Sequence, residues 1–100
     1  MVEDDARWLI RAINELQAND RVGVLVRIDN PVTYRAGIGP DFYPESPRCD
    51  AAVAHLVNQG ALAREEVLDA SDVIGQAYSY VGQAYGFFKI TQTGIDMAKS

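Results

Sequence analysis

The residues of this chain that could carry out catalysis or bind a metal are few and far apart. It has one histidine, His55, and one cysteine, Cys49. A protein zinc site needs three or four such ligands, so we expect no metal and no other cofactor. Glu65 and Glu66 are neighbours on a predicted strand, where successive side chains point to opposite faces, so they cannot form a catalytic dyad. No phosphate-binding loop, dinucleotide fingerprint or Gly-x-Ser-x-Gly motif occurs, and we do not expect an enzyme.

Recognition by polar and aromatic side chains is the other chemistry that these residue types allow. Arg, Asn and Gln are suited to reading base edges in DNA. The candidate DNA-binding residues are Arg35, Arg48, Asn58, Gln59, Gln76 and Gln83. Tyrosine and tryptophan are enriched at protein interfaces. The candidate partner-contact residues are Trp8, Tyr78, Tyr80 and Tyr85.

The charge balance disfavours nucleic acid as the partner. The formal net charge is -5, and no segment of the 100 residues is strongly basic. Phosphate neutralisation supplies most non-specific DNA affinity, so a protein partner, or a homodimer formed through the first helix, is the stronger expectation. With 48% hydrophobic residues, the chain is predicted to be one globular domain spanning residues 1–100.

The cellular location is predicted from the N-terminal residues, the length of the apolar stretches and the number of cysteines. The acidic start at Glu3-Asp4-Asp5 has no apolar run after it and does not resemble a signal peptide. The longest apolar stretch is too short to span a bilayer, so we expect no membrane association. A single cysteine cannot form an internal disulfide. These features predict a reducing, cytoplasmic location.

Two amphipathic helices are predicted to position the candidate residues. In residues 5–18 the apolar side chains recur at helical spacing, with Asp4 or Asp5 as the N-cap. This face consists of Ala6, Leu9, Ile10, Ile13 and Leu16. Trp8 is expected to widen it as core or partner-facing packing.

The second helix is predicted at 47–59, because Ser46 suits an N-cap and Pro47 suits the first turn. Gly60 should end this helix in the left-handed conformation. We expect Cys49 to lie on its buried stripe as a small apolar side chain, and His55 to be an ordinary helix histidine.

Strands are predicted on both sides of this second helix. β-Branched residues alternate along 22–28, and Asp29-Asn30-Pro31 reads as a turn, so a hairpin spanning 22–37 is expected. After Gly60, residues 61–67 should form a strand with Leu62 turned inward. The aromatic segment 75–86 should be hairpin-like, and 86–90 should return as a strand.

The last element is expected to be a short helix at 92–99, capped by Thr91, with Ile95 turned inward. The predicted fold class is therefore α+β, in the order helix, strand or hairpin, helix, two-stranded wing and short C-terminal helix.

From Ser46 onward the chain resembles winged-helix regulators of the MarR and PadR kind. The phrase Leu56-Val57-Asn58-Gln59-Gly60-Ala61-Leu62 is similar to the end of their recognition helix. Ile90-Thr91-Gln92-Thr93-Gly94 is similar to the point where their second wing strand enters a helix. The resemblance implies a winged-helix fold and a role in transcription-related regulation or assembly, with DNA as one partner.

Residues 34–46 separate two functional hypotheses. A DNA-binding helix-turn-helix needs a helix before the recognition helix, but two glycines and two prolines fall within 34–44. Either a short, distorted helix occupies this place, or the hairpin replaces it. A helix, with Arg35 and Arg48 on a common basic face, would favour DNA. A hairpin would favour a module that contacts only proteins, and a small-ligand site using the aromatic hairpin is a third hypothesis.

Overall fold

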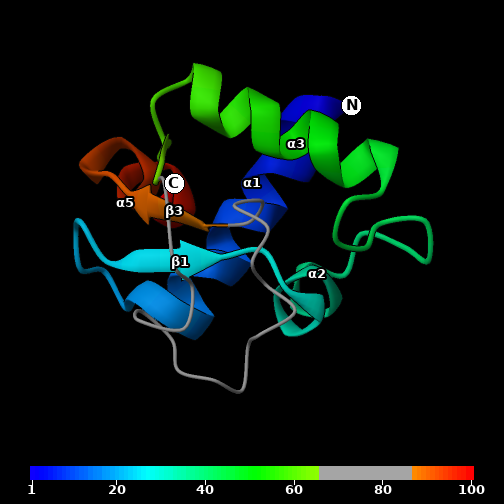
Figure 1. Cartoon of the computed structure of the whole chain (residues 1–100), viewed down its shortest axis with the longest axis horizontal. Helices are drawn as coiled ribbons and strands as arrows, with labels where there is room; N and C mark the ends of the chain where they lie inside the picture. The colour runs from blue at the N-terminus through cyan, green and yellow to red at the C-terminus, as the bar shows by residue number, and fades with distance from the viewer. Residues whose placement is uncertain (66–86) are drawn as a thin grey trace.

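The protein is an α+β structure in which helices pack on a small antiparallel sheet (Figure 1). The computed structural model describes residues 1–65 and 87–100. Within these ranges no helix is both long enough and apolar enough to cross a membrane. In chain order the elements are α1 (Val2–Ile13), the π-helix η1 (Asn14–Ala18), β1 (Leu25–Arg27), α2 (Asn30–Ala36), α3 (Pro47–Asn58), β2 (Leu62–Arg64), β3 (Phe87–Ile90) and α5 (Gln92–Lys99).

The sheet has β3 in the middle, with β1 and β2 antiparallel to it on either side. Val26 of β1 faces Phe88, and Arg64 of β2 faces Phe88 from the other side. The outer edge of β1 is covered by Gln17 of η1, whose side-chain amide donates to the Arg27 carbonyl and accepts from the Arg27 N–H. This pairing satisfies backbone groups that an edge strand otherwise leaves open.

Helix α1 is the centre of the packing, because α2, α3 and α5 all pack against it (Figure 1). The predicted apolar face is confirmed for most of its length. Its fully buried members are Ala6, Leu9, Ile10 and Ile13, with Ala12 beside them. The predicted cap is wrong: α1 begins at Val2 after Met1, so Asp4 and Asp5 lie inside the helix rather than before it.

The predicted burial of Leu16 is also wrong. Leu16 is 44% exposed, and Ala18 is fully buried instead. The reason is η1, because a π-helical turn holds more residues than an α-turn and rotates the following side chains around the axis. The segment ends at Asn19, which adopts the left-handed conformation.

The predicted hairpin over 22–37 is wrong in its second half, where α2 forms instead. The carboxylate of Asp29 accepts a hydrogen bond from the N–H of Val32 at 3.0 Å and so acts as an N-cap. Pro31 fits the first helical turn, where a missing N–H has no cost. Gly37 ends the helix with a φ of 67°. The residues that looked like a turn are the start of a helix, and a helix therefore precedes α3.

The prediction for α3 is confirmed at both ends. Ser46 accepts a hydrogen bond from the N–H of Cys49, and Pro47 opens the helix. Gly60 has a φ of +76°. Its N–H donates to the Val57 carbonyl, and the Ala61 N–H donates to the Leu56 carbonyl. These two bonds form a Schellman motif, which satisfies carbonyls that the helix end would otherwise leave unpaired.

The end of α3 is joined directly to the start of α5. The hydroxyl of Thr91 donates to the carbonyls of Gly60 and Ala61, at 2.6 and 3.0 Å, and accepts from the N–H of Gly94. A methyl group at Gly94 would lie 2.3 Å from the Ala61 carbonyl oxygen. The close backbone approach therefore requires glycine at position 94, and the α3–β2 turn and the β3–α5 junction form one joint.

The other predictions for the second half are confirmed where residues are described. Leu62 of β2 and Ile95 of α5 are buried, and Thr91 caps α5. The predicted strand at 86–90 corresponds to β3. The expected aromatic hairpin at 75–86, together with Gln76, Gln83 and the tyrosines Tyr78, Tyr80 and Tyr85, lies outside the described residues.

The substitution Gly94→Ala should destabilise the fold by about 3 kcal/mol or more, because a rigid backbone oxygen occupies the space of the new methyl group. Urea denaturation measures the change. Gly60→Ala is the matched control: its left-handed φ should cost about 1 kcal/mol without any clash. Equal losses of unfolding free energy in the two variants would contradict the close backbone contact at Gly94.

The turn after η1 should make stability depend on acid pH. The amide of Asn14 donates to the Asp20 carboxylate at 2.7 Å, and Lys99 lies 3.3 Å from the same side chain. These partners, Asn14 foremost, lower the pKa of Asp20 below 3.8. The stabilisation is therefore present above the unfolded-state pKa and is lost as the pH falls through the lower folded-state value.

Urea denaturation between neutral and strongly acidic pH measures this effect. Asp20→Asn should remove part of the acid sensitivity of the wild-type protein. Asp96→Asn, which alters an exposed carboxylate on α5, is the control. Identical pH profiles for the wild type and Asp20→Asn would contradict the assignment.

Candidate interaction site

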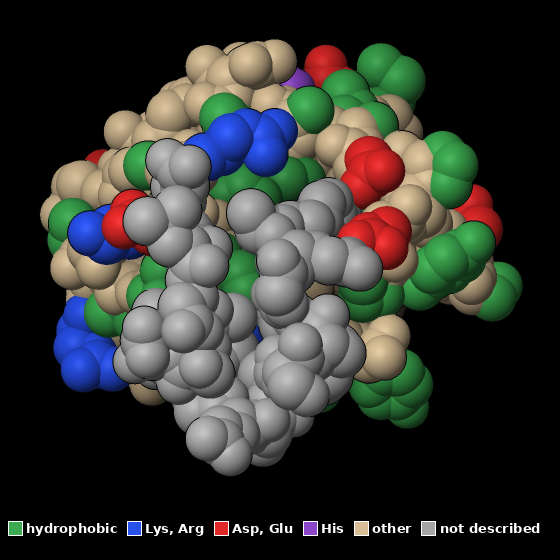
Figure 2. All heavy atoms as spheres, viewed as in Figure 1, with side chains coloured by type: hydrophobic (Ala, Val, Ile, Leu, Met, Phe, Trp, Pro, Cys, Tyr) green, Lys and Arg blue, Asp and Glu red, His purple; other side chains and the backbone are tan. Residues whose placement is uncertain are grey.

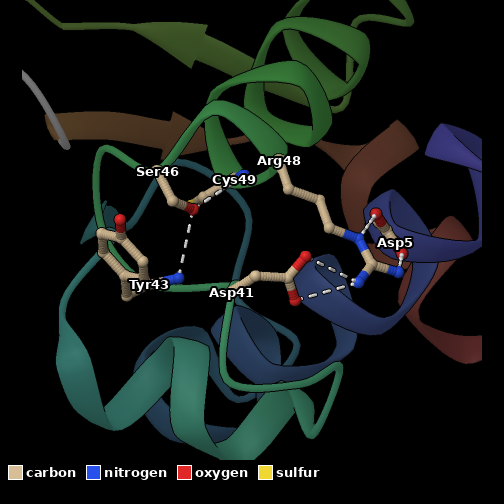
Figure 3. Close-up of polar contacts among 6 residues, drawn as sticks. All are labelled: Asp5, Asp41, Tyr43, Ser46, Arg48 and Cys49. Atoms are coloured by element: carbon tan, nitrogen blue, oxygen red, sulfur yellow. Dashed lines mark hydrogen bonds and ion pairs between the residues drawn. The ribbon is translucent and has the colours of Figure 1, made fainter.

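Arg48 lies between two carboxylates at the start of α3 (Figure 3). Its Nε and Nη2 atoms donate to the two oxygens of Asp5, at 2.7 and 3.0 Å. Its Nη1 atom donates to Asp41, at 3.2 and 3.4 Å. The Asp5 pairing is the bidentate geometry that gives arginine its strongest carboxylate contacts. Arg48 therefore joins α1, the α2–α3 loop (37–46) and α3 in one ionic cluster.

The burial of the two partners differs, and this decides which contact is stronger. The Asp5 side chain is 9% exposed and the Asp41 side chain is 66% exposed. A buried carboxylate needs a cation, whereas a pair at the surface contributes little. The hydrogen bonds that Arg48 donates to Asp5, followed by the charges of Asp5 and Asp41, outweigh the effect of burial and raise the pKa of Arg48 above its usual value. Arg48 is thus held as a structural cation facing α1.

Ser46 orders the loop just before this cluster (Figure 3). Its hydroxyl oxygen accepts from the N–H groups of Tyr43 and Cys49, both at 3.2 Å. Its own N–H donates to the Tyr43 carbonyl at 2.9 Å. Ser46 is 1% exposed, so these bonds are shielded from water. The cap of α3 therefore also sets the backbone position of Tyr43.

Arg35 is paired near the end of the continuous helical segment formed by α1 and η1, far from Asp5. Its guanidinium contacts Glu15 of η1, and each side chain is 55% exposed. Asp5 and Glu15 are about 15 Å apart along a helix with a rise of 1.5 Å per residue. The structure therefore does not bring Arg35 and Arg48 together on a common basic face, and it gives each of them a carboxylate partner.

Arg48 is the only Lys or Arg of α3, a helix described over its whole length, and this side chain is paired with Asp5 and Asp41; the rest of the solvent-facing side of the helix carries neither. It presents Asp50, Ala51, Ala54 and Asn58, which are exposed, and His55, which is half-buried. The two remaining DNA-binding candidates, Asn58 and Gln59, lie together at the C-terminal end of the helix. The described residues contain no group of three or more His, Cys, Asp or Glu side chains that could hold a metal ion.

Large aromatic side chains are exposed around the other end of α3. Trp8 is 51% exposed, and the Arg11 guanidinium lies over its ring at 5.2 Å. Trp8 is thus on the surface, where it is available to a partner. Tyr34 of α2 is 89% exposed and Tyr43 of the α2–α3 loop is 53% exposed. Neither tyrosine is among the predicted partner-contact residues, and Tyr34 was predicted to lie in a hairpin.

Tyr34 and Tyr43 border a pocket of about 480 Å³ between α2 and the α2–α3 loop, which we call the aromatic groove. It is lined mainly by the side chains of Asn30, Thr33, Tyr34, Pro40, Phe42 and Tyr43. A smaller pocket of about 260 Å³ lies between Trp8, Asp4 and Arg48. Gly37 and Ile38 line both pockets, so the two hollows are adjacent.

The role of Asp5 as the buried partner of Arg48 was not predicted, because the acidic residues around it suggested a helix cap. One signal was available in the sequence: Asp5 precedes Leu9 by four residues and so shares its buried helical face. The identity of its partner was not readable, because Arg48 is 43 residues away in the chain.

Comparison of the chain with protein-family models, with curated proteins and with solved structures finds no match. The function must therefore be argued from the site itself.

Arg48→Met should destabilise the protein by about 3 kcal/mol, because it leaves the Asp5 carboxylate buried without a cation. Arg35→Met is the matched control, since it breaks an exposed pair and should cost less than about 1 kcal/mol. Urea denaturation of both variants makes the comparison. Adding Asp5→Asn to Arg48→Met should recover part of the loss. A loss for Arg48→Met no larger than that for Arg35→Met would contradict a structural role for Arg48.

Proposed function

We propose that the protein is a winged-helix-like module that contacts another protein rather than DNA, in a cytoplasmic, transcription-related regulation or assembly process. The observation that carries this proposal is the pairing of Arg48. It is the cation at the N-terminal end of α3, where a recognition helix contacts DNA. Its guanidinium is paired with Asp5 and Asp41, although the side chain stays 40% exposed. Exposed Asp50 would also repel phosphates at this end.

The arrangement of elements supports the winged-helix part of the proposal. α2 precedes α3, and the strand order β1-β3-β2 places the last strand between the other two. The joint between Thr91 and the Gly60–Ala61 turn connects the two phrases on which the resemblance rests. A fold by itself does not imply a function, so the choice of partner depends on the surface.

DNA binding is the second candidate function, and α2 is the observation that favours it, because a helix does precede α3. Against it stands the connection 37–46, which is longer than the turn of about three to four residues in DNA-binding helix-turn-helix motifs. The exposed aromatic side chains Trp8, Tyr34 and Tyr43 support a protein contact, since such residues anchor protein interfaces.

A salt series with random duplex DNA separates the two functions. We expect no binding even at low salt, where the phosphate contribution is largest. Fluorescence anisotropy of labelled DNA is the measurement. Binding that weakens steeply with salt, and weakens further in Arg35→Ala, would overturn the proposed function. Arg21→Ala is the control for loss of one surface positive charge.

A further inference from the structure

We propose that the aromatic groove binds a short, extended segment of another protein that contains proline and carries arginine or lysine. This inference rests on the proposed function, because it names the chemistry of the protein partner. The size and lining of the groove, its hydrogen-bond donors and the charged side chains around it each favour such a segment.

The size and lining of the groove suit an extended peptide. Its volume of about 480 Å³ lies in the range of pockets that bind small molecules. The rings of Tyr34, Pro40 and Tyr43 line it, and Tyr34 and Tyr43 are largely exposed. Proline-rich segments bind aromatic-lined grooves because their extended conformation is formed in advance and little entropy is lost on binding.

The polar groups of the groove complement a segment rich in carbonyl oxygens. An extended proline-containing chain has solvated carbonyl acceptors and few N–H donors. Tyr34 and Tyr43 offer hydroxyl donors, and the Asn30 amide offers two more. Within the described residues, none of these three side chains has a hydrogen-bond partner. Donors that project beside an apolar wall can orient a peptide backbone.

The charge around the groove selects a basic segment. In the view of Figure 2, hydrophobic and acidic side chains gather around the α2–α3 loop. Arg35 of α2 is paired with Glu15. Exposed Glu45 follows Pro40 in the loop and exposed Asp4 borders the adjacent pocket, whereas Asp41 is already paired with Arg48. Such a field attracts cations and repels acidic chains. An arginine or lysine flanking the bound proline would meet these carboxylates.

The test is an NMR titration of the whole ¹⁵N-labelled chain with the heptapeptide Arg-Pro-Pro-Leu-Pro-Pro-Arg. Two matched peptides replace both arginines by glutamate, or all prolines by alanine. We expect the first peptide to shift amides of residues 30–43, with a Kd below about 1 mM. Each matched peptide should bind at least tenfold more weakly. Tyr34→Ala and Tyr43→Ala should each weaken binding at least tenfold, whereas Leu16→Ala, an exposed apolar control on η1, should not.

Three outcomes would overturn the inference: no binding at about 1 mM, equal binding of the glutamate peptide, or binding that Tyr34→Ala leaves unchanged. Self-association that is lost in Tyr34→Ala would also overturn it, by showing that a second copy covers the groove; sedimentation at several concentrations detects this. The DNA titration reports separately on the proposed function. Failure of the peptide with no DNA binding rejects only the groove assignment, whereas salt-sensitive DNA binding rejects the proposed function itself.

Discussion

A carboxylate packed between helices needs a cation, and in this protein Arg48 supplies it for Asp5. Asp5 lies on the buried side of α1, around which the other helices pack. Its two oxygens hold the guanidinium of Arg48, which stands one residue inside α3. The start of α3 is therefore set relative to α1 by charge as well as by apolar contact. The α2–α3 loop is drawn into the same cluster through Asp41.

The other end of α3 is held by backbone geometry instead of charge. The Thr91 hydroxyl bonds the turn at Gly60 and Ala61, and Gly94 leaves room for the Ala61 carbonyl. This joint lets β2 and β3 pair beside each other and begins α5 at a defined position. An ionic cluster at one end of α3 and a close backbone contact at the other together fix the position of this helix.

These constraints have consequences for the surface. Because Arg48 neutralises a buried carboxylate, the N-terminal end of α3 offers no free guanidinium to phosphates. Because Ser46 and the cluster order the α2–α3 loop, Tyr43 is held across a groove from Tyr34. The surface that results is aromatic and acidic. This chemistry supports a protein partner with a basic, proline-containing segment, and the same contacts that stabilise the fold create it.

Local signals in the sequence were enough to predict α3, β3 and α5. Ser46, Gly60 and Thr91 take part in helix ends through hydrogen bonds between residues only three to five positions apart, so these capping roles can be read from neighbouring residues. The bonds from Thr91 to Gly60 and Ala61 span about thirty residues and could not be read in this way. Asp29-Asn30-Pro31 was ambiguous, because the same residue types begin turns and cap helices.

Tertiary structure alone decided the rest. The pairing of Asp5 with Arg48 depends on packing between distant parts of the chain. The π-helical turn that exposes Leu16 also holds Gln17, which bonds to the backbone of Arg27 in β1. Which charges are neutralised and which aromatic side chains stay exposed follow from that packing, because burial is a property of the folded surface and not of any local segment.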